Sequence, residues 1–233
     1  MKLIARAMFG LLAFCAVASA AEPAKKNVLF IISDDLNCYL GAYGNKHVKT
    51  PNMDRLADRG TLFTNAQCQY PVCGPSRASF MSGLRPNTTR VLGNGPSLYK
   101  NMPNVMTIGR YFRMGGYTTA RIGKIFNSVD NSDKRDWDEL LNPRVSAKQS
   151  AGGMGKVIEA GHKHWNFQWR APDCDDEDIS DGANTAAVVK WLGAKREKPF
   201  FMAVGLKKPH QPLVVPKKYY DLYDKKTLPK AWD

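Results

Sequence analysis

A cysteine, a proline, a serine and an arginine stand close together in a stretch whose chemistry would suit an anion. They are Cys73, Pro75, Ser76 and Arg77. Proline pre-sets the backbone of a first helical turn and serine can cap a helix, so the pattern predicts a helix over 76–82. Residue 73 would lie near the positive start of that helix, and Arg77 would add a permanent charge. An ordinary buried cysteine before a serine-capped helix is the alternative.

Two adjacent carboxylates, Asp34 and Asp35, follow the unbroken apolar run Val28–Ile32. Such a run is typical of a central parallel strand that is covered on both faces. In open α/β sheets, ligands bind beyond the carboxyl ends of the strands. Adjacent carboxylates there supply hard oxygen ligands for Ca²⁺ or Mg²⁺, and a cation relieves their mutual repulsion. A solvated turn that caps a helix is the alternative.

Two more polar side chains follow predicted strands. A strand is predicted over 117–122, and Gly123 and Lys124 follow it directly. A second strand is predicted over 200–206, and His210 follows it shortly afterwards. Taken singly, a lysine at a strand end is usually only solvated, and a histidine next to proline is more often structural. In company with the cysteine motif and the paired carboxylates, both become candidate site residues.

The remaining elements predict an α/β domain. Helices are expected over 50–60, 103–114 and 180–195, and one further strand over 61–66. Strands that alternate with helices favour a mostly parallel central sheet with helices on both faces. Residues 127–178 are rich in Asn, Ser, Gly and Asp and show no sustained period, so we expect a long insertion with little regular structure.

The first twenty residues are typical of a secretory signal peptide. A basic start, an apolar centre and a small-residue cleavage site follow one another, namely Lys2 and Arg6, Met8–Val17, and Ala18–Ala20. We expect cleavage after Ala20 and export to the periplasm or the extracellular space. No later apolar run approaches the ~20 residues that a membrane-spanning helix needs.

The chain is strongly basic. Its formal net charge of +13 falls to +11 when Lys2 and Arg6 leave with the signal peptide. This balance favours anionic partners. For an exported protein, an acidic polysaccharide is a more plausible partner than nucleic acid. The alternative is that the charge only keeps the protein soluble.

The segment Asn27–Pro86, with its cysteine motif and paired aspartates, is similar to the start of sulfatases, which belong to the alkaline-phosphatase-like superfamily. The resemblance implies that a formylglycine-generating enzyme oxidises Cys73 to formylglycine. The hydrated aldehyde is then the nucleophile: one hydroxyl attacks the sulfur of a sulfate ester and the other later expels sulfate. It also implies that Arg77 steadies this diol, and that Asp34, Asp35 and residue 73 bind Ca²⁺, or Mg²⁺ in its place.

The resemblance extends to the two later strand ends. Lys124 matches a lysine that contacts the sulfate and assists the leaving oxygen, and His210 matches a histidine that is a candidate proton donor to that oxygen. Asn127 stands where a second histidine is usual. An amide can hydrogen-bond the diol or the sulfate but cannot titrate near neutral pH, so more of the proton transfer would fall on His210.

Among sulfatases, the chain is most similar to the iduronate 2-sulfatase branch, on the phrases Leu40–Gly44, Ser82–Arg90 and Lys208–His210. This implies a sulfated sugar, a glycosaminoglycan-like polysaccharide or a small sulfate ester as substrate. Sulfatases carry further metal ligands and another lysine farther downstream. We therefore interpret residues 21–233 as the N-terminal part of a catalytic domain, and expect this part alone to be weakly active or inactive.

Two tryptophans offer a hypothesis about the substrate. Trp165 and Trp169 lie in an aromatic and basic stretch, and tryptophan faces stack on sugar rings. Packing of the insertion onto the domain is the alternative.

Two other functions stay open. One is hydrolysis of phosphate or phosphonate esters, since the same superfamily hosts it. The other is non-catalytic binding of sulfated glycans, which Asn127 and the basic charge favour.

Of the four cysteines that follow the signal peptide, none has a zinc-site spacing. If Cys73 is converted, the three that remain, Cys38, Cys68 and Cys174, allow at most one disulfide.

Overall fold

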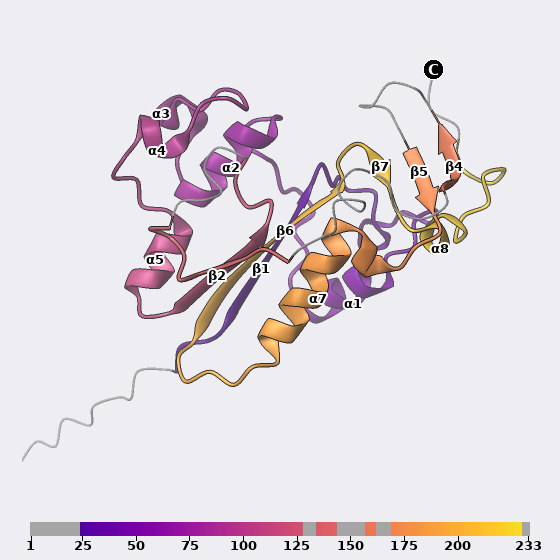
Figure 1. The fold of residues 1–233 in the computed structure, drawn as a ribbon. Helices are drawn as coiled ribbons and strands as arrows, with labels where there is room; N and C mark the ends of the chain where they lie inside the picture. Colours follow the sequence, from indigo (N-terminus) through magenta and orange to yellow (C-terminus); the bar gives the residue numbers. More distant parts are fainter. Residues whose placement is uncertain (1–23, 128–133, 144–156, 162–168, 230–233) are drawn as a thin grey trace, which may run out of the picture.

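A parallel sheet forms the centre of the computed structural model, which describes residues 24–127, 134–143, 157–161 and 169–229. The strand order is β1-β6-β2-β3 and every pairing is parallel (Figure 1). The strands are β1 (Val28–Asp34), β6 (Phe200–Pro209), β2 (Thr118–Gly123) and β3 (Glu139–Leu141). The predicted class, α/β with a mostly parallel sheet, is confirmed.

Helices cover both faces of this sheet (Figure 1). On one face lie α2 (Cys73–Ser82) and α5 (Ile108–Met114), and on the other lies α7 (Ser180–Leu192). Successive side chains of the central strand β6 serve the two faces in turn, because strand side chains alternate in direction. Phe201 and Ala203 pack on the α2 side, and Met202 and Val204 pack on the α7 side. An unbroken apolar run is what a strand buried on both faces requires.

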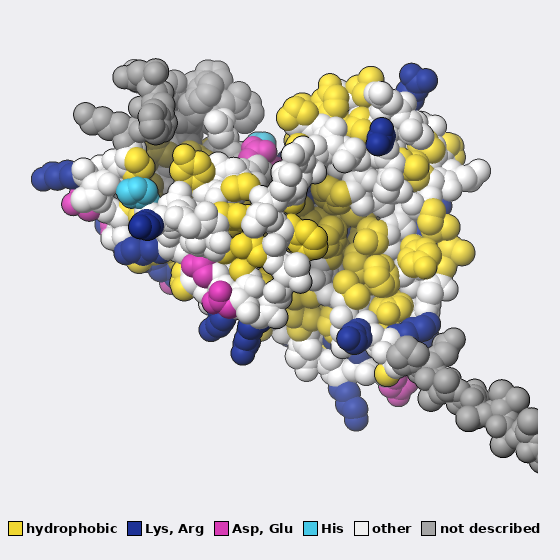
Figure 2. Space-filling model, turned by 180° about the vertical axis from the view of Figure 1, so that it is seen from behind, with side chains coloured by type: hydrophobic (Ala, Val, Ile, Leu, Met, Phe, Trp, Pro, Cys, Tyr) yellow, Lys and Arg dark blue, Asp and Glu magenta, His cyan; other side chains and the backbone are white. Residues whose placement is uncertain are grey.

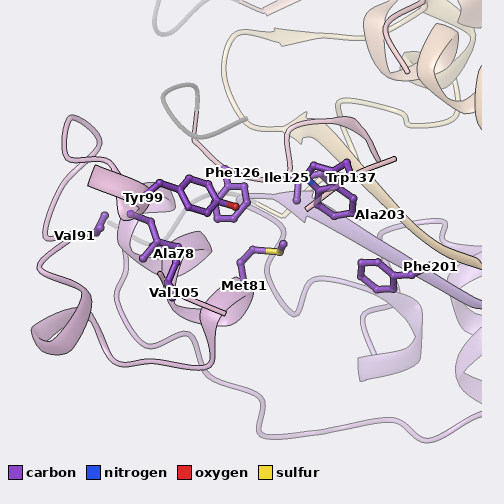
Figure 3. Packing of buried hydrophobic residues seen from close by; sticks show 11 residues of the cluster. Ala78, Met81, Val91, Tyr99, Val105, Ile125, Phe126, Trp137, Phe201 and Ala203 are labelled. Atoms are coloured by element: carbon purple, nitrogen blue, oxygen red, sulfur yellow. The ribbon is translucent and has the colours of Figure 1, made fainter. Parts of the chain in front are cut away.

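The larger hydrophobic cluster joins α2, the segment after β2 and the centre of β6 (Figure 3). Phe201 is fully buried, and its ring stacks on Phe112 with centroids 4.4 Å apart and on Trp137 with centroids 6.0 Å apart. Met81 and Ala78 of α2 belong to the same cluster. The packing fixes α2, and hence its first residue, against the sheet.

The smaller elements lie around this frame. They are η1 (Gly41–Tyr43), α1 (Pro51–Arg59), α3 (Pro86–Thr89), α4 (Leu98–Asn101), β4 (Val157–Gly161), β5 (Trp169–Pro172), η3 (Asp176–Asp178), β7 (Leu213–Val214) and α8 (Lys217–Tyr220). Strands β4, β5 and β7 form a second sheet in that order. The stretch 127–178 therefore holds more regular structure than we expected. Its strands of three to five residues are too short to show a period in the sequence.

Two predicted elements need correction. Residues 61–66 form no strand, and Phe63 is 70% exposed. A strand exists only through a ladder with a neighbour, and no ladder forms for this segment among the described residues. The helix predicted over 103–114 begins only at Ile108, because the Thr107 side chain accepts a hydrogen bond from the Arg110 N–H at 3.2 Å and so caps the helix there.

One edge of the sheet is apolar and open. The apolar run 28–32 was predicted to be a central strand covered on both faces, and this needs correction, because β1 pairs only with β6 among the described strands and its other edge carries no ladder. Leu29 and Ile31, which point to the α7 side, are 44% and 55% exposed. Hydrophobic side chains also gather in broad patches on the face shown in Figure 2.

Phe201→Ala should lower the free energy of unfolding by about 3–5 kcal/mol, because the change leaves a cavity between stacked rings. Urea titration of the purified chain at neutral pH would measure the loss. The control is Phe63→Ala on the exposed segment, which should change stability by less than ~0.5 kcal/mol. Equal losses for the two variants would contradict this description of the core.

Candidate active site

Three of the predicted site residues meet at the carboxyl ends of β1, β2 and β6. Asp34 ends β1, Lys124 directly follows β2, and His210 directly follows β6. The Lys124 ammonium contacts Asp34, and the Nε2 atom of His210 lies 4.0 Å from Asp34 and 3.9 Å from Asp35. They meet because neighbouring parallel strands bring their carboxyl ends to one edge of the sheet.

Asp34 is the centre of this group. Its side chain is almost completely buried, with one oxygen accepting a hydrogen bond from Arg77 Nη2 at 2.8 Å and the other accepting one from Lys124. Burial alone would raise the pKa of Asp34, but the hydrogen bonds and positive charges of Lys124 and Arg77 outweigh burial and hold this pKa below its ordinary value. The carboxylate is therefore charged at neutral pH and joins β1 to α2 and β2.

Helix α2 begins at Cys73, three residues earlier than predicted. Val72 is the N-cap residue, and no side chain caps the helix. Ser76 lies inside the first turn, where its N–H donates to the Val72 carbonyl at 3.0 Å. Pro75 is tolerated because N–H groups of a first turn have no helical partner. Cys73 thus stands at the positive end of the helix dipole, as predicted, although serine capping is not the reason.

Arg77 braces the site from one turn further along α2. Besides Asp34, its guanidinium donates to the backbone carbonyl oxygens of Lys124 and Ile125, the latter at 3.0 Å. The side chain is 3% exposed. These contacts fix the ends of β1 and β2 relative to the helix. The predicted contact of Arg77 with a diol at residue 73 stays a prediction.

Two facing glycines let β2 and β6 come close where Lys124 leaves the sheet. Gly123 has a φ of 70°, which favours glycine, and a Cβ there would collide with the Gly205 carbonyl oxygen. A Cβ on Gly205 would collide with the backbone of Lys124 in turn. The Lys124 N–H donates to the Gly205 carbonyl at 3.0 Å. This close approach turns the lysine toward Asp34.

The imidazole of His210 has a defined orientation. Its Nδ1 lies 2.6 Å from the Gln211 carbonyl oxygen. A carbonyl oxygen only accepts, so Nδ1 carries the proton and donates it. The Nε2 atom is left facing the two aspartates. The ring is 40% exposed, which leaves it open to a ligand.

Asp181 is a positioning residue that the sequence argument missed. It lies in the first turn of α7, and its carboxylate accepts from the N–H groups of Lys207 at 2.9 Å and Lys208 at 2.8 Å. The Lys208 ammonium donates to the backbone carbonyl oxygens of His210 and Pro212. Burial lowers the pKa of Lys208. Together these bonds hold the turn that carries His210, and the only sequence signal was an acidic residue in a predicted first turn.

Asn127 and Asn94 bring a loop against residue 73. The Asn127 amide donates to the Asn94 backbone carbonyl at 2.9 Å. The Asn94 side-chain oxygen accepts from the Gly74 N–H at 2.8 Å and lies 3.2 Å from the Cys73 sulfur. The structure thus places the predicted Asn127 near the cysteine. Only the turn-forming residues around Asn94 hinted at a loop at this position.

Of the two tryptophans predicted to stack on sugar rings, the structure describes Trp169. Trp165 lies outside the described residues. Trp169, in β5, stacks on Tyr220 with centroids 5.4 Å apart and has the Lys225 ammonium 5.3 Å from its ring centre. These contacts agree with packing of the insertion, and sugar stacking by Trp169 stays a prediction.

The described residues supply part of a cation site. Asp34 and Asp35 offer hard oxygens, but both oxygens of Asp34 already accept from cationic groups and the Asp35 side chain is 60% exposed. No group of three or more His, Cys, Asp or Glu side chains in the described ranges is placed to hold a metal ion. Calcium takes ~6–8 oxygens, more than this pair provides.

Cys38, Cys68, Cys73 and Cys174 are free in the structure. No helix among the described residues is long and apolar enough to span a membrane. The predicted signal peptide, residues 1–20, lies outside the described part of the chain.

A parallel α/β sheet with a cysteine-headed helix and a buried carboxylate at its strand ends is the arrangement that the sequence resemblance implied. The family model for sulfatases matches residues 26–231, so the chain belongs to the sulfatase family. The resemblance stated from the motifs is confirmed.

Relatives with established names agree with this assignment. The chain is 34% identical to a sulfatase of Formosa agariphila, over 87% of this chain and 42% of that protein. It is 35% identical to the iduronate 2-sulfatase of Homo sapiens, over 89% of this chain and 39% of that enzyme. The chain therefore spans less than half the length of these relatives.

Solved structures show the same fold. The phosphonate monoester hydrolase of Agrobacterium radiobacter superposes with a TM-score of 0.69 at 24% identity, over 88% of this chain and 45% of that one. A 2-O GAG sulfatase superposes with a TM-score of 0.55 at 25% identity, over 79% of this chain and 35% of that one. The first likeness concerns the fold alone.

Asp34→Asn should remove an acid-dependent part of the stability. Because the pKa of Asp34 is lowered by folding, its carboxylate contributes stability that is present above the unfolded-state pKa of about 3.9 and is lost as pH falls through the folded-state pKa. Urea titrations from roughly pH 3 to pH 7 should show a steeper acid loss for wild type than for the variant. At pH 7 the variant should lose about 3–5 kcal/mol, because Arg77 and Lys124 lose their counter-charge.

The control for this series is Asp58→Asn on the exposed surface of α1. It should leave the pH dependence of the wild-type chain intact. If the free energy of unfolding depends on pH in the same way in Asp34→Asn and Asp58→Asn, Asp34 is not an ionised carboxylate paired with two cations.

Proposed function

We propose that the protein hydrolyses sulfate esters, with residue 73 as the nucleophile after its conversion from cysteine to formylglycine. The observation that supports this most strongly is the attachment of the cysteine-headed helix α2, through Arg77, to the Asp34 and Lys124 pair at the strand ends. Membership of the sulfatase family supports the same chemistry. Once hydrated, formylglycine supplies one hydroxyl that attacks sulfur and a second that later expels sulfate.

The charges around residue 73 suit a sulfate group. Cys73 stands at the N-terminus of a ten-residue helix, where an anion is favoured. Of the two cations paired with Asp34, Lys124 is the more exposed, with 16% of its side chain accessible against 3% for Arg77. It can therefore contact a sulfate oxygen from its place beside Asp34, and add to the charge stabilisation of the transition state.

Proton transfer to the leaving oxygen falls to His210. Its Nδ1–H is held by the Gln211 carbonyl, so Nε2 is the atom that faces the site and exchanges the proton. Asn127 cannot share this role because an amide does not titrate near neutral pH. The hydroxyl of a sugar is a poor leaving group as an alkoxide, so a sugar sulfate needs this proton more than an aryl sulfate does.

A divalent cation completes the proposal. Asp34, Asp35 and residue 73 would hold Ca²⁺, or Mg²⁺ in its place, and the cation would supply positive charge beside the sulfate. Such an ion would compete with the Lys124 ammonium for the second oxygen of Asp34. It would also need more oxygen ligands than these three residues provide.

The substrate we propose is a sulfated sugar of an anionic polysaccharide. The relatives include the iduronate 2-sulfatases of mouse and human, and the net charge of +13 favours a polyanion. Trp165 and Trp169 would stack on sugar rings of that polymer. Export through the signal peptide would bring the enzyme to such a polymer, and a formylglycine-generating enzyme would mature it.

Conversion of Cys73 and sulfate hydrolysis should occur together. The protein, with any coding sequence that follows residue 233, is produced beside a formylglycine-generating enzyme. Mass spectrometry of the peptide that contains residue 73 should show the aldehyde, and Cys73→Ala should lower kcat/KM for a sulfate ester at least about 10³-fold. Cys68→Ala is the matched control and should leave kcat/KM unchanged.

Substrate arms of the same assay separate the alternatives. Faster turnover of matched phosphate or phosphonate esters would favour the related hydrolase function. Salt-sensitive glycan binding with an intact thiol and without turnover would favour a binding protein.

His210→Gln should slow the hydrolysis of an unactivated sugar sulfate by about 10²–10⁴-fold, because general acid catalysis is lost. The loss should be much smaller for an aryl sulfate whose phenol leaves without a proton. His47→Gln on the exposed surface is the control. Equal losses on both substrates would contradict proton donation by His210 and would point to a structural role.

A further inference from the structure

The loop between α3 and α4 lies over the first residue of α2. Its Asn94 side-chain oxygen accepts hydrogen bonds from two neighbouring groups, the Cys73 thiol at 3.2 Å and the Gly74 N–H at 2.8 Å. A single acceptor therefore contacts both the side chain of residue 73 and the peptide that follows it. Asn94 belongs neither to the motif around Cys73 nor to a strand end.

Gly74 makes this close contact possible. A Cβ at position 74 would lie 2.7 Å from the Gly93 carbonyl oxygen and 3.1 Å from the Asn94 Cα, both backbone atoms of the loop. Any larger residue at 74 must push the loop away from residue 73. The loop is also anchored at both ends, because Val91 and Leu98 are buried in the core. The position of Asn94 is thus set by packing on either side of it.

Asn127 supports the loop from the opposite direction. Its amide donates to the Asn94 backbone carbonyl at 2.9 Å. Asn127 thereby fixes Asn94, and Asn94 in turn contacts Cys73. This gives a physical use to an asparagine at a position where the family resemblance led us to expect a histidine.

We propose that Asn94 is a positioning residue for the nucleophile at residue 73. Its amide oxygen fixes the orientation of the group that the Cβ of residue 73 carries, which is the thiol before conversion and one of two hydroxyls afterwards. One lone pair of the amide oxygen already accepts from the Gly74 N–H, so the oxygen can accept from one hydroxyl and leaves the other to face the sulfate. The amide is uncharged and does not repel that anion, as a carboxylate in its place would.

This inference rests on the proposed function, because residue 73 has to be the nucleophile. Its first test does not depend on that function. In chain produced without the maturation enzyme, the Cys73 thiol must break its hydrogen bond to Asn94 before it reacts. Asn94→Ala should therefore raise the rate of iodoacetamide alkylation at Cys73 several-fold, measured peptide by peptide with mass spectrometry.

Internal and matched controls belong to this measurement. The exposed Cys68 reports general reactivity in every variant and should keep its rate. Asn87→Ala, on the exposed surface of α3, should react like wild type. Asn94→Asp keeps an acceptor oxygen in the same place and should restore slow alkylation of Cys73. An unchanged Cys73 rate in Asn94→Ala overturns the proposal.

The second test uses the converted protein and an aryl sulfate. Asn94→Ala should lower kcat by about 10–10²-fold with KM nearly unchanged, because a misplaced nucleophile loses rate and not binding. Asn94→Asp should recover part of kcat but raise KM for the anionic substrate. A rise in KM alone for Asn94→Ala would overturn the positioning role.

The two proposals fail in different ways. If wild-type protein with a fully converted residue 73 does not hydrolyse the sulfate ester, the proposed function is wrong. The alkylation rates would still decide whether Asn94 holds residue 73.

Discussion

The buried carboxylate of Asp34 is the constraint on which the site depends. Removing a carboxylate from water costs several kcal/mol, and attraction to well-placed partners has to offset that cost. Two cations do so here, Arg77 from α2 and Lys124 from the end of β2. A cluster of this kind adds little net stability. It does restrict the positions of its members, because the buried carboxylate tolerates few arrangements of its partners. The ends of β1 and β2 and the first turns of α2 are therefore fixed relative to one another.

The sheet supplies this geometry through close backbone approach. Gly123 and Gly205 face each other at the point where β2 and β6 part, and neither position has room for a side chain. Lys124 leaves the sheet there and returns to Asp34. On the neighbouring strand end, Asp181 holds the backbone before His210. Lys124 and His210 are thus positioned by contacts of the backbone next to them.

Much of this could be predicted from the sequence. Unbroken apolar runs located β1 and β6, although only β6 is buried on both faces and β1 lies at the edge of the described sheet. Strand β2, which contains two threonines and an arginine, was predicted as the segment that leads to Gly123 and Lys124. The strand-end rule then pointed to Asp34, and the family resemblance pointed to Lys124 and His210. Asn94 and Asp181 could not be found in this way. Asn94 reaches back twenty positions to Gly74 and Asp181 reaches forward twenty-six to Lys207, and such hydrogen bonds depend on the folded loops and not on local pattern.

The open edge of β1 affects how the chain can associate with other polypeptides. Its backbone donors and acceptors on that side have no ladder among the described strands, and Leu29 and Ile31 present apolar groups beside them. An unpaired, apolar edge is a template onto which another polypeptide can add a strand. This edge is therefore the part of the described sheet at which association between chains is expected at high concentration.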